Sequence, residues 1–254
     1  MPLNLLAISI GNTRAHFGAF VDDELDDTAA AEVDKGEAEL ERLAGKIAGR
    51  PNAMCLVGSV HPAAAKRIAS LAERHFPDTV YHVEKDVPIA IGRQLDPEAI
   101  VGDDRLLNAA AAYDVTKQAC AIVDAGTAVT VDFVDGAGTY HGGAILPGVA
   151  MMLQSLARGG AQLPEVAWDR PQEAIGHNTQ EAVRSGIFHG LRGAVRELVE
   201  TFAESTSGYP LVVATGGDAE TLFDDYPLVE RIVPDLTLQG IAVTARSAKS
   251  AAES

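Results

Sequence analysis

The chain has 254 residues, of which 47% are hydrophobic and 22% charged, a composition that excludes disordered, collagen-like and disulfide-rich classes. Its length suits one large domain or two small ones. The formal net charge of −16 argues against nucleic-acid and membrane-surface partners, because like charges repel. Cys55 and Cys120 lie in apolar runs, so we expect buried free thiols. With no leader or membrane-spanning run, a cytosolic protein is expected.

Hydrophobic patterning predicts alternating strands and helices in the first part of the chain. The run at 3–10 ends at Gly11-Asn12, so a strand, a tight turn and a second strand at 16–20 are expected. The acid-rich stretch 22–41 is interpreted as a solvated face. The elements expected next are a helix at 37–48, a strand at 53–57, a helix at 62–75, a strand at 81–83 and a helix at 102–113.

The second part of the chain starts again with a strand, a turn and a strand. The elements expected are strands at 119–123, 129–134 and 140–146, helices at 148–158 and 179–204, strands at 211–214 and 231–233, and a closing helix at 236–248.

A short internal repeat links the two parts. The segment 8–13 and the segment 123–127 both read apolar, polar, apolar, glycine, then a hydroxyl or amide, and they lie 115 residues apart. Two similar α/β halves, 1–115 and 116–254, are therefore expected, each a mixed sheet with flanking helices and with a cleft between them. A chance match over so few positions is the alternative.

The two turns of this repeat are candidate phosphate sites. Glycine allows close approach of a ligand, and successive backbone N–H groups form a concave anion site. Asn12, Thr13 and Thr127 add short polar side chains. Two ordinary hairpins are the alternative interpretation. Neither a Walker phosphate loop nor a G-x-S-x-G nucleophile elbow is present, and the seven histidines lack metal-ligand spacing.

A third candidate is Gly102-Asp103-Asp104-Arg105, which opens the helix at 102–113. Carboxylates at this position stabilise a helix N-terminus through the macrodipole, and that is one interpretation. In the other, one carboxylate accepts a proton from a substrate hydroxyl while Arg105 binds an anionic group of the substrate.

Taken in order, these segments resemble the type III pantothenate kinases of the acetate and sugar kinase/Hsp70/actin superfamily. The likeness spans about residues 3–245 and rests on an ordered set of motifs. The matching segments are Gly11-Asn12-Thr13, Gly102-Asp103-Asp104-Arg105, Asp124-Ala125-Gly126-Thr127-Ala128-Val129-Thr130, Gly142-Gly143-Ala144-Ile145-Leu146-Pro147-Gly148, Asn178-Thr179, Thr215-Gly216-Gly217 and Pro234-Asp235-Leu236-Thr237-Leu238-Gln239-Gly240.

The resemblance implies duplicated actin-like (ribonuclease H-like) α/β halves and an ATP-dependent phosphotransferase that converts pantothenate to 4′-phosphopantothenate, the first step toward coenzyme A. It implies that Asp104 is the general base, that Asp124 holds a monovalent cation (potassium or ammonium) and that the enzyme is a Mg²⁺-using homodimer. The implied pantothenate contacts are Gly102, Asp103, Asp104, Arg105 and Thr179. The implied ATP contacts are Ser9, Ile10, Gly11, Asn12, Thr13, Arg14, Ala15, His16 and Thr127.

Two departures from the family pattern keep other functions open. Ser9 stands where the family's first motif has an aspartate that helps to organise hydrated magnesium, and no tyrosine lies between Tyr81 and Tyr113, where the family carries one that contacts substrate. The alternatives are a kinase for another small hydroxyl substrate, or a weakly active or non-catalytic nucleotide- or pantothenate-binding regulator similar to Bvg accessory factor.

Overall fold

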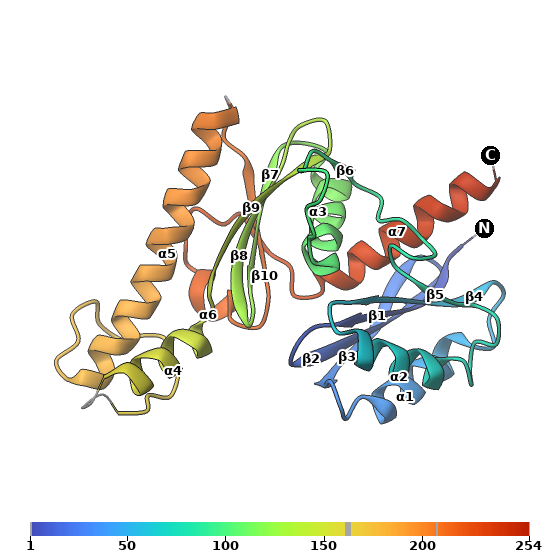
Figure 1. The fold of residues 1–254 in the computed structure, drawn as a ribbon, viewed down its shortest axis with the longest axis horizontal. Coiled ribbons are helices and arrows are strands. Elements are labelled where there is room, and N and C mark those ends of the chain that lie inside the picture. The colour runs from blue at the N-terminus through green and yellow to red at the C-terminus, as the bar shows by residue number, and fades with distance from the viewer. Residues whose placement is uncertain (1, 161–163, 207, 254) are drawn as a thin grey trace. The chain divides into compact units, whose positions relative to one another are not determined.

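The computed structural model describes residues 2–160, 164–206 and 208–253. The chain divides into two compact units. Unit 1 comprises Met1–Gly92, Asp96–Val115 and Asp235–Ser254, and unit 2 comprises Arg93–Leu95 and Thr116–Pro234. Figure 1 shows each unit as a sheet with its own helices.

Unit 1 contains a five-stranded mixed sheet in the order β3-β2-β1-β4-β5. The first three strands form an antiparallel meander, and β4 and β5 add in parallel to β1. Strand β1 lies in the centre of the sheet. All 7 of its residues are buried, so the strand is covered on both faces. The strands are β1 (Asn4–Ile10), β2 (Arg14–Val21), β3 (Glu24–Glu32), β4 (Ala53–Ser59) and β5 (Val80–His82).

Helices flank both faces of this sheet. Alternation along β2 sends Phe17 into the hydrophobic cluster shared with α1 and α2, whereas the Cα of Gly18 faces Leu238 on α7. In α1, the buried stripe Leu40, Leu43 and Ile47 has helical spacing. The helices of this unit are α1 (Glu37–Ile47), α2 (Pro62–Ala72), α3 (Asp103–Thr116) and α7 (Leu236–Glu253).

Unit 2 contains a six-stranded sheet in the order β11-β10-β7-β8-β9-β6. Its core joins one face of β7, β8 and β10 to α4, α5 and α6. The elements are β6 (Gly92–Arg93), β7 (Cys120–Ala125), β8 (Ala128–Val134), β9 (Thr139–Pro147), α4 (Val149–Gly159), α5 (Thr179–Thr206), β10 (Leu211–Thr215), α6 (Ala219–Phe223) and β11 (Arg231–Ile232).

The two sheets repeat the same topology. The order β3-β2-β1-β4-β5 corresponds to β9-β8-β7-β10-β11, with the same antiparallel and parallel neighbours, and β6 extends the second sheet. The repeat at 8–13 and 123–127 falls at the same place in each sheet, where the central strand enters its hairpin turn. The predicted α/β fold with two related mixed sheets is confirmed.

Three parts of the sequence prediction were wrong or incomplete. The closing helix α7 packs on β1, β2 and β4 of unit 1, so unit 2 ends at Pro234 and differs from the expected half 116–254. The short elements β6 and α6 were missed. The acid-rich stretch 22–41 contains a whole strand, β3, in addition to the start of α1.

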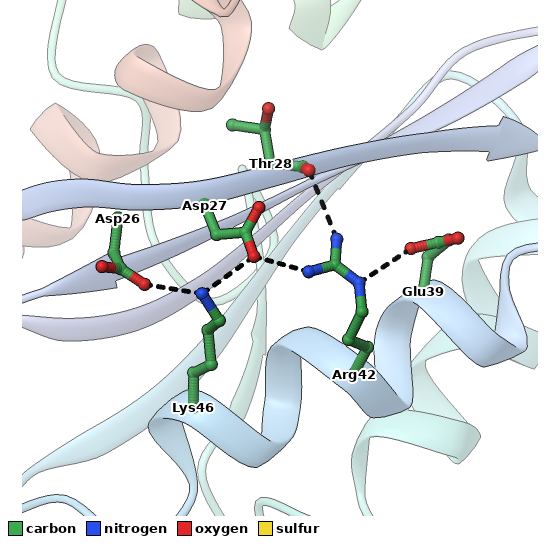
Figure 2. A network of polar contacts seen from close by, with 6 residues as sticks. All are labelled: Asp26, Asp27, Thr28, Glu39, Arg42 and Lys46. Atoms are coloured by element: carbon green, nitrogen blue, oxygen red, sulfur yellow. Dashed lines mark hydrogen bonds and ion pairs between the residues drawn. The ribbon is translucent and has the colours of Figure 1, made fainter.

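Ion pairs between β3 and α1 explain why acidic residues are tolerated on this edge strand. Asp27 accepts hydrogen bonds from Arg42 at 2.5 Å and contacts Lys46 at 2.8 Å, and Lys46 also contacts Asp26 at 2.9 Å (Figure 2). These bonds lower the pKa of Asp27 from its ordinary value to about 2, first through Lys46 and then through Arg42. Charges on an edge strand also discourage pairing with other chains.

Two general expectations concern the cysteines and membrane-spanning helices. Cys55 and Cys120 are buried and free, as predicted. Over the described residues, every helix is too short or too polar to cross a membrane.

Candidate active site

The first glycine turn lies at the carboxyl end of β1, in unit 1. The Gly11 N–H donates to the Arg14 carbonyl at 2.9 Å and closes the turn, while Asn12 and Thr13 are exposed. Ser9 is 9% exposed and sits directly opposite His16 on β2. The carboxyl ends of central strands are where α/β sheets bind ligands, so this exposed polar turn is suitably placed for phosphate.

Two of the expected ATP contacts face away from this turn. Ile10 is 2% and Ala15 is 0% exposed, and both belong to the hydrophobic cluster beneath α1 and α2. Their side chains stabilise the hairpin, so only their backbone groups are available to a ligand. The sequence motif did not distinguish these two roles.

His16 is exposed at the surface of β2 but keeps little positive charge at neutral pH. Displacement of water by surrounding protein lowers its pKa below the usual value, Asp235 opposes that effect, and Arg14 adds to it by repulsion. The first turn therefore offers Arg14 as its formal cation, together with backbone N–H groups and neutral side chains.

The predicted general base lies at the first turn of α3, also in unit 1. The Arg105 N–H donates to the Asp104 Oδ1 at 2.9 Å and lies 3.1 Å from the Gly102 carbonyl. A Cβ atom at Gly102 would lie 2.5 Å from the Asp104 Oδ1, so only glycine leaves room for the carboxylate in this position. The helix N-terminus favours the ionised form of such a carboxylate.

Buried contacts fix the position of α3 within unit 1. Leu106 and Leu107 are buried directly after the predicted site residues. Asn108 is 2% exposed, and its Oδ1 accepts a 2.7 Å hydrogen bond from the Thr237 hydroxyl of α7. The backbone of Gly240 approaches Leu107 so closely that a Cβ would lie 2.1 Å from the Leu107 carbonyl oxygen. The buried contacts of α3 thus fix the position of its first turn, which carries Asp103, Asp104 and Arg105.

The second glycine turn, in unit 2, is rich in oxygen atoms. Asp124 is half-buried near the end of β7. A Cβ at Gly216, whose φ is +96°, would lie 2.5 Å from both the Asp124 Oδ1 and the Ala125 carbonyl oxygen. A Cβ at Gly148 would lie 2.4 Å from the carbonyl oxygens of Gly126 and Thr127. Glycines therefore let the segment at Gly216 approach the Asp124 carboxylate and the segment at Gly148 approach the turn that follows it.

This donor set fits a hard cation better than a transition metal. Carboxylate and carbonyl oxygens are the ligands that potassium and similar ions prefer. Groups of three or more His, Cys, Asp or Glu side chains arranged for a metal are absent from the described residues. Asp124 and the neighbouring backbone oxygens thus form a set of ligands suited to such a cation.

Thr179, the expected pantothenate contact of unit 2, is exposed at the start of α5. Asn178 and Glu181 cap this helix, since the Glu181 N–H donates to the Asn178 Oδ1 at 3.0 Å and the Asn178 side chain donates to Glu181 at 2.7 Å. Hydrogen bonds from the His177 N–H and from Asn178 lower the pKa of Glu181. The cap fixes where the helix begins and hence where Thr179 stands.

Sequence reasoning missed one buried carboxylate in unit 2. Asp132 of β8 is 1% exposed and accepts hydrogen bonds from the hydroxyls of Tyr140, at 2.6 Å, and Thr130, at 3.1 Å. The available signal was the alternation in β8, where Thr130 and Asp132 share a face and valines occupy the other.

The hollow found in unit 1 is not part of the candidate site. Its volume is about 260 Å³, and it lies at the C-terminal part of α3, whereas Asp104 is at the N-terminus of that helix. Its lining residues are Phe20, Asp23, Leu25, Ala111, Asp114, Val115, Gln239, Ala242, Val243 and Arg246.

The repeated five-strand order, with a glycine turn after each central strand, gives the chain a duplicated, actin-like α/β fold. A ROK family protein from Streptococcus pneumoniae is similar in structure, with a TM-score of 0.56, 13% identity, and coverage of 98% of this chain and 100% of that one. A Campylobacter jejuni protein described as a Baf family transcriptional activator gives a TM-score of 0.65 at 20% identity, covering 96% and 99%. At these identities the likeness establishes the fold alone.

Sequence comparison identifies the family within this fold class. The family model described as type III pantothenate kinase matches residues 5–201. A type III pantothenate kinase from Rhodospirillum rubrum is 36% identical over 252 residues, covering 95% of this chain and 98% of that protein. The chain belongs to the type III pantothenate kinase family.

Proposed function

We propose that this protein transfers the γ-phosphoryl group of ATP to the primary hydroxyl of pantothenate, forming 4′-phosphopantothenate. Family membership supports the reaction. The observation that carries the chemistry is Asp104, a carboxylate at a helix N-terminus for which Gly102 leaves the necessary space.

Asp104 is proposed to orient the pantothenate hydroxyl and to accept its proton. Phosphoryl transfer has a loose transition state, so positioning and charge stabilisation contribute more than base strength. An aspartate with an ordinary pKa of about 3.9 is ionised at neutral pH and can take the proton late in the reaction. Arg105 is proposed to bind the pantothenate carboxylate, and Gly102 and Asp103 are proposed to add contacts beside it. Thr179 is proposed to contact pantothenate across a dimer interface.

The nucleotide phosphates are proposed to bind the first turn through the Gly11 to Arg14 segment and its backbone N–H groups, with Ser9, His16 and the backbone of Ile10 and Ala15 beside it. Mg²⁺ enters with ATP as its complex. Thr127, in the turn between β7 and β8, is proposed as a further nucleotide contact on the basis of the family resemblance.

Asp124 and nearby backbone oxygens are proposed to hold potassium or ammonium. A cation bound there would supply positive charge beside the second turn. The close approach of Gly216 keeps the Asp124 carboxylate in place.

The decisive experiment measures ADP release with and without pantothenate, Mg²⁺ and potassium. Asp104→Asn is expected to abolish pantothenate-dependent ADP release while leaving ATP affinity within a few-fold of wild type, because the amide cannot accept the proton. Asp114→Asn is the matched control, because it makes the same change near the C-terminal end of α3, outside the proposed contacts. An Asp104→Asn variant with full turnover would refute the role of Asp104.

A second candidate, a weakly active or non-catalytic binding protein, is favoured by one observation. Ser9 holds the position in unit 1 that Asp124 holds in unit 2, so the first turn lacks the carboxylate of its counterpart. Ser9→Asp tests this: a large rise from near-zero activity supports the second candidate, and high wild-type turnover excludes it. A panel of other small alcohols tests the third possibility, a different acceptor.

We also propose that the protein is a homodimer and acts in the cytosol, where its free cysteines remain reduced. Light scattering should give twice the chain mass of 26.6 kDa. A mass of one chain would contradict the dimer.

A further inference from the structure

One motif of the sequence, at 234–240, has no part in the reaction proposed above. It leads into α7, which belongs to unit 1. Leu238 is 1% exposed and packs on the sheet, where its Cδ1 lies 3.1 Å from the place of a Cβ at Gly18. Thr237 and Gly240 are three residues apart and are therefore neighbours on the surface of α7. Both contact α3, the helix that carries the proposed general base.

A hydrogen bond joins Thr237 to a buried residue of α3. The Thr237 hydroxyl donates to the Asn108 Oδ1 at 2.7 Å, although the two residues are 129 positions apart in the chain. Asn108 is 2% exposed. A hydrogen bond in such surroundings is directional and stronger than one in water, so it restricts sliding and rotation of one helix against the other.

Close backbone packing accompanies this hydrogen bond. A Cβ at Gly240 would lie 2.1 Å from the carbonyl oxygen of Leu107, so the two helices touch through their backbones. On β4, a Cβ at Gly58 would lie 3.0 Å from the Leu107 Cδ1 and 3.7 Å from the Ile241 Cδ1, so α3 and α7 pack on the same place in the sheet. Apolar contacts are non-directional and leave the register of the two helices loosely defined. The Thr237 hydroxyl defines it.

Asn108 lies one helical turn beyond Asp104 on α3. Residues four apart lie on the same side of a helix, with a rise of about 6 Å between them, and the backbone hydrogen bonds join them. A shift of α3 at Asn108 is therefore transmitted to Asp104. A displacement of about 1 Å from the productive geometry lowers the rate about 100-fold.

We infer that Thr237 is a positioning residue for Asp104 and acts through its hydrogen bond to Asn108. The inference rests on the proposed role of Asp104 as the general base. It gives a function to the start of α7: the sheet fixes α7, Thr237 fixes α3 on α7, and α3 holds the carboxylate. Arg105 stands on the same turn as Asp104 and is held by the same contacts.

The test measures kcat and both KM values for pantothenate-dependent ADP release, together with thermal unfolding. Thr237→Val removes the hydrogen-bond donor at nearly constant volume, and Thr237→Ser retains it. Thr244→Val is the matched control, because Thr244 lies seven residues further along the same side of α7 and is 0% exposed. Among the residues that the structure describes, the Thr244 hydroxyl has no hydrogen-bond partner.

Thr237→Val should lower kcat about 10-fold or more and raise KM for pantothenate a few-fold, because Asp104 and Arg105 move together. KM for ATP should stay within about two-fold of wild type, since the proposed phosphate turn lies between β1 and β2. Thr237→Ser should keep kcat within about two-fold of wild type. Thr244→Val should keep wild-type kinetics and melt at an equal or higher temperature, because valine removes a buried unpaired hydroxyl.

The rise in KM for pantothenate separates positioning from stability, because a loss of folded enzyme lowers kcat and leaves KM unchanged. A double-mutant cycle tests the route through Asn108. In the Asn108→Ala background, Thr237→Val should lower kcat by less than about two-fold, and an equal loss in both backgrounds would overturn that route. The single Thr237 variants decide the positioning role even where Asn108→Ala does not fold.

Wild-type kcat in Thr237→Val, or an equal loss in Thr237→Ser, would overturn the inference while the proposed function stands. Wild-type protein that releases no ADP with pantothenate would instead remove the proposed function. Full turnover by Asp104→Asn, measured in the same assay, would remove the role of Asp104 and the inference with it.

Discussion

The substitution Gly102→Ala tests whether the position of the Asp104 carboxylate controls catalysis. The added Cβ would lie 2.5 Å from the Asp104 Oδ1, whereas ordinary contacts begin near 3.4 Å. The carboxylate must therefore move by roughly 1 Å, and a displacement of that size from the productive geometry lowers the rate about 100-fold. This corresponds to about 2.7 kcal/mol of lost transition-state stabilisation. Gly102 lies outside the positive-φ region, so alanine adds no backbone strain there.

The assay is pantothenate-dependent ADP release, measured as kcat and as KM for each substrate. Gly45→Ala in α1 is the matched control, because it adds the same methyl group in unit 1 where no atom lies within 4 Å. The control should keep wild-type kinetics and melt at an equal or slightly higher temperature, since alanine favours helix over glycine. Gly102→Ala with wild-type kcat, or with a loss explained fully by unfolding, would refute the argument.

Three further outcomes are expected. Gly216→Ala should lower unfolding free energy by at least about 2 kcal/mol in thermal or urea unfolding, because φ is +96° and the Cβ meets the Ala125 backbone at 2.5 Å; wild-type stability would contradict this. Asp27→Asn should reduce stability at pH 7, but the difference from wild type should vanish as pH falls from about 4 through 2, because the folded pKa lies below the unfolded one; a difference in stability between Asp27→Asn and wild type that persists below pH 2 would count against the ion pairs of Asp27 with Lys46 and Arg42. Cys120, whose pKa burial raises to about 11, should react with a thiol reagent at pH 7.5 only upon unfolding, and fast labelling of the native protein would contradict its burial.

Local pattern predicted most of the fold because most strands and helices here carry a clear period. Both hairpins, the stripe of α1 and the proline start of α2 follow from short-range spacing. Strand β3 was missed because its residues ELDDTAAAE have low β-propensity and alternate weakly. Its stability depends on pairing with β2 and on ion pairs from α1, such as Lys46 to Asp27, which are tertiary contacts.

The local structure of the candidate site was also predicted in part from the sequence. The helix start at Asp104 and the turns after β1 and β7 are local features, and the structure has them where expected. Whether a motif residue faces solvent or core is decided by packing, so the motif could not show that the Ala15 side chain is buried. Asp132 was missed because the alternation in β8 indicates only that one face is polar, and its partner Tyr140 lies on the next strand.

The two turns of the repeat differ in charge. Ser9 and Asp124 occupy the same topological position, but only the second retains a carboxylate, and the residue opposite Ser9 is a histidine with a lowered pKa. The first turn is therefore suited to phosphate, with Arg14, backbone N–H groups and a serine in place of the acid, whereas the second is suited to a cation. Restoring the acid in Ser9→Asp adds both a magnesium-organising group and a repulsive charge. Its effect should thus depend on Mg²⁺, with activity rising at high Mg²⁺ and ATP binding weakening without it, and a change that is independent of Mg²⁺ would show that Ser9 acts through packing alone.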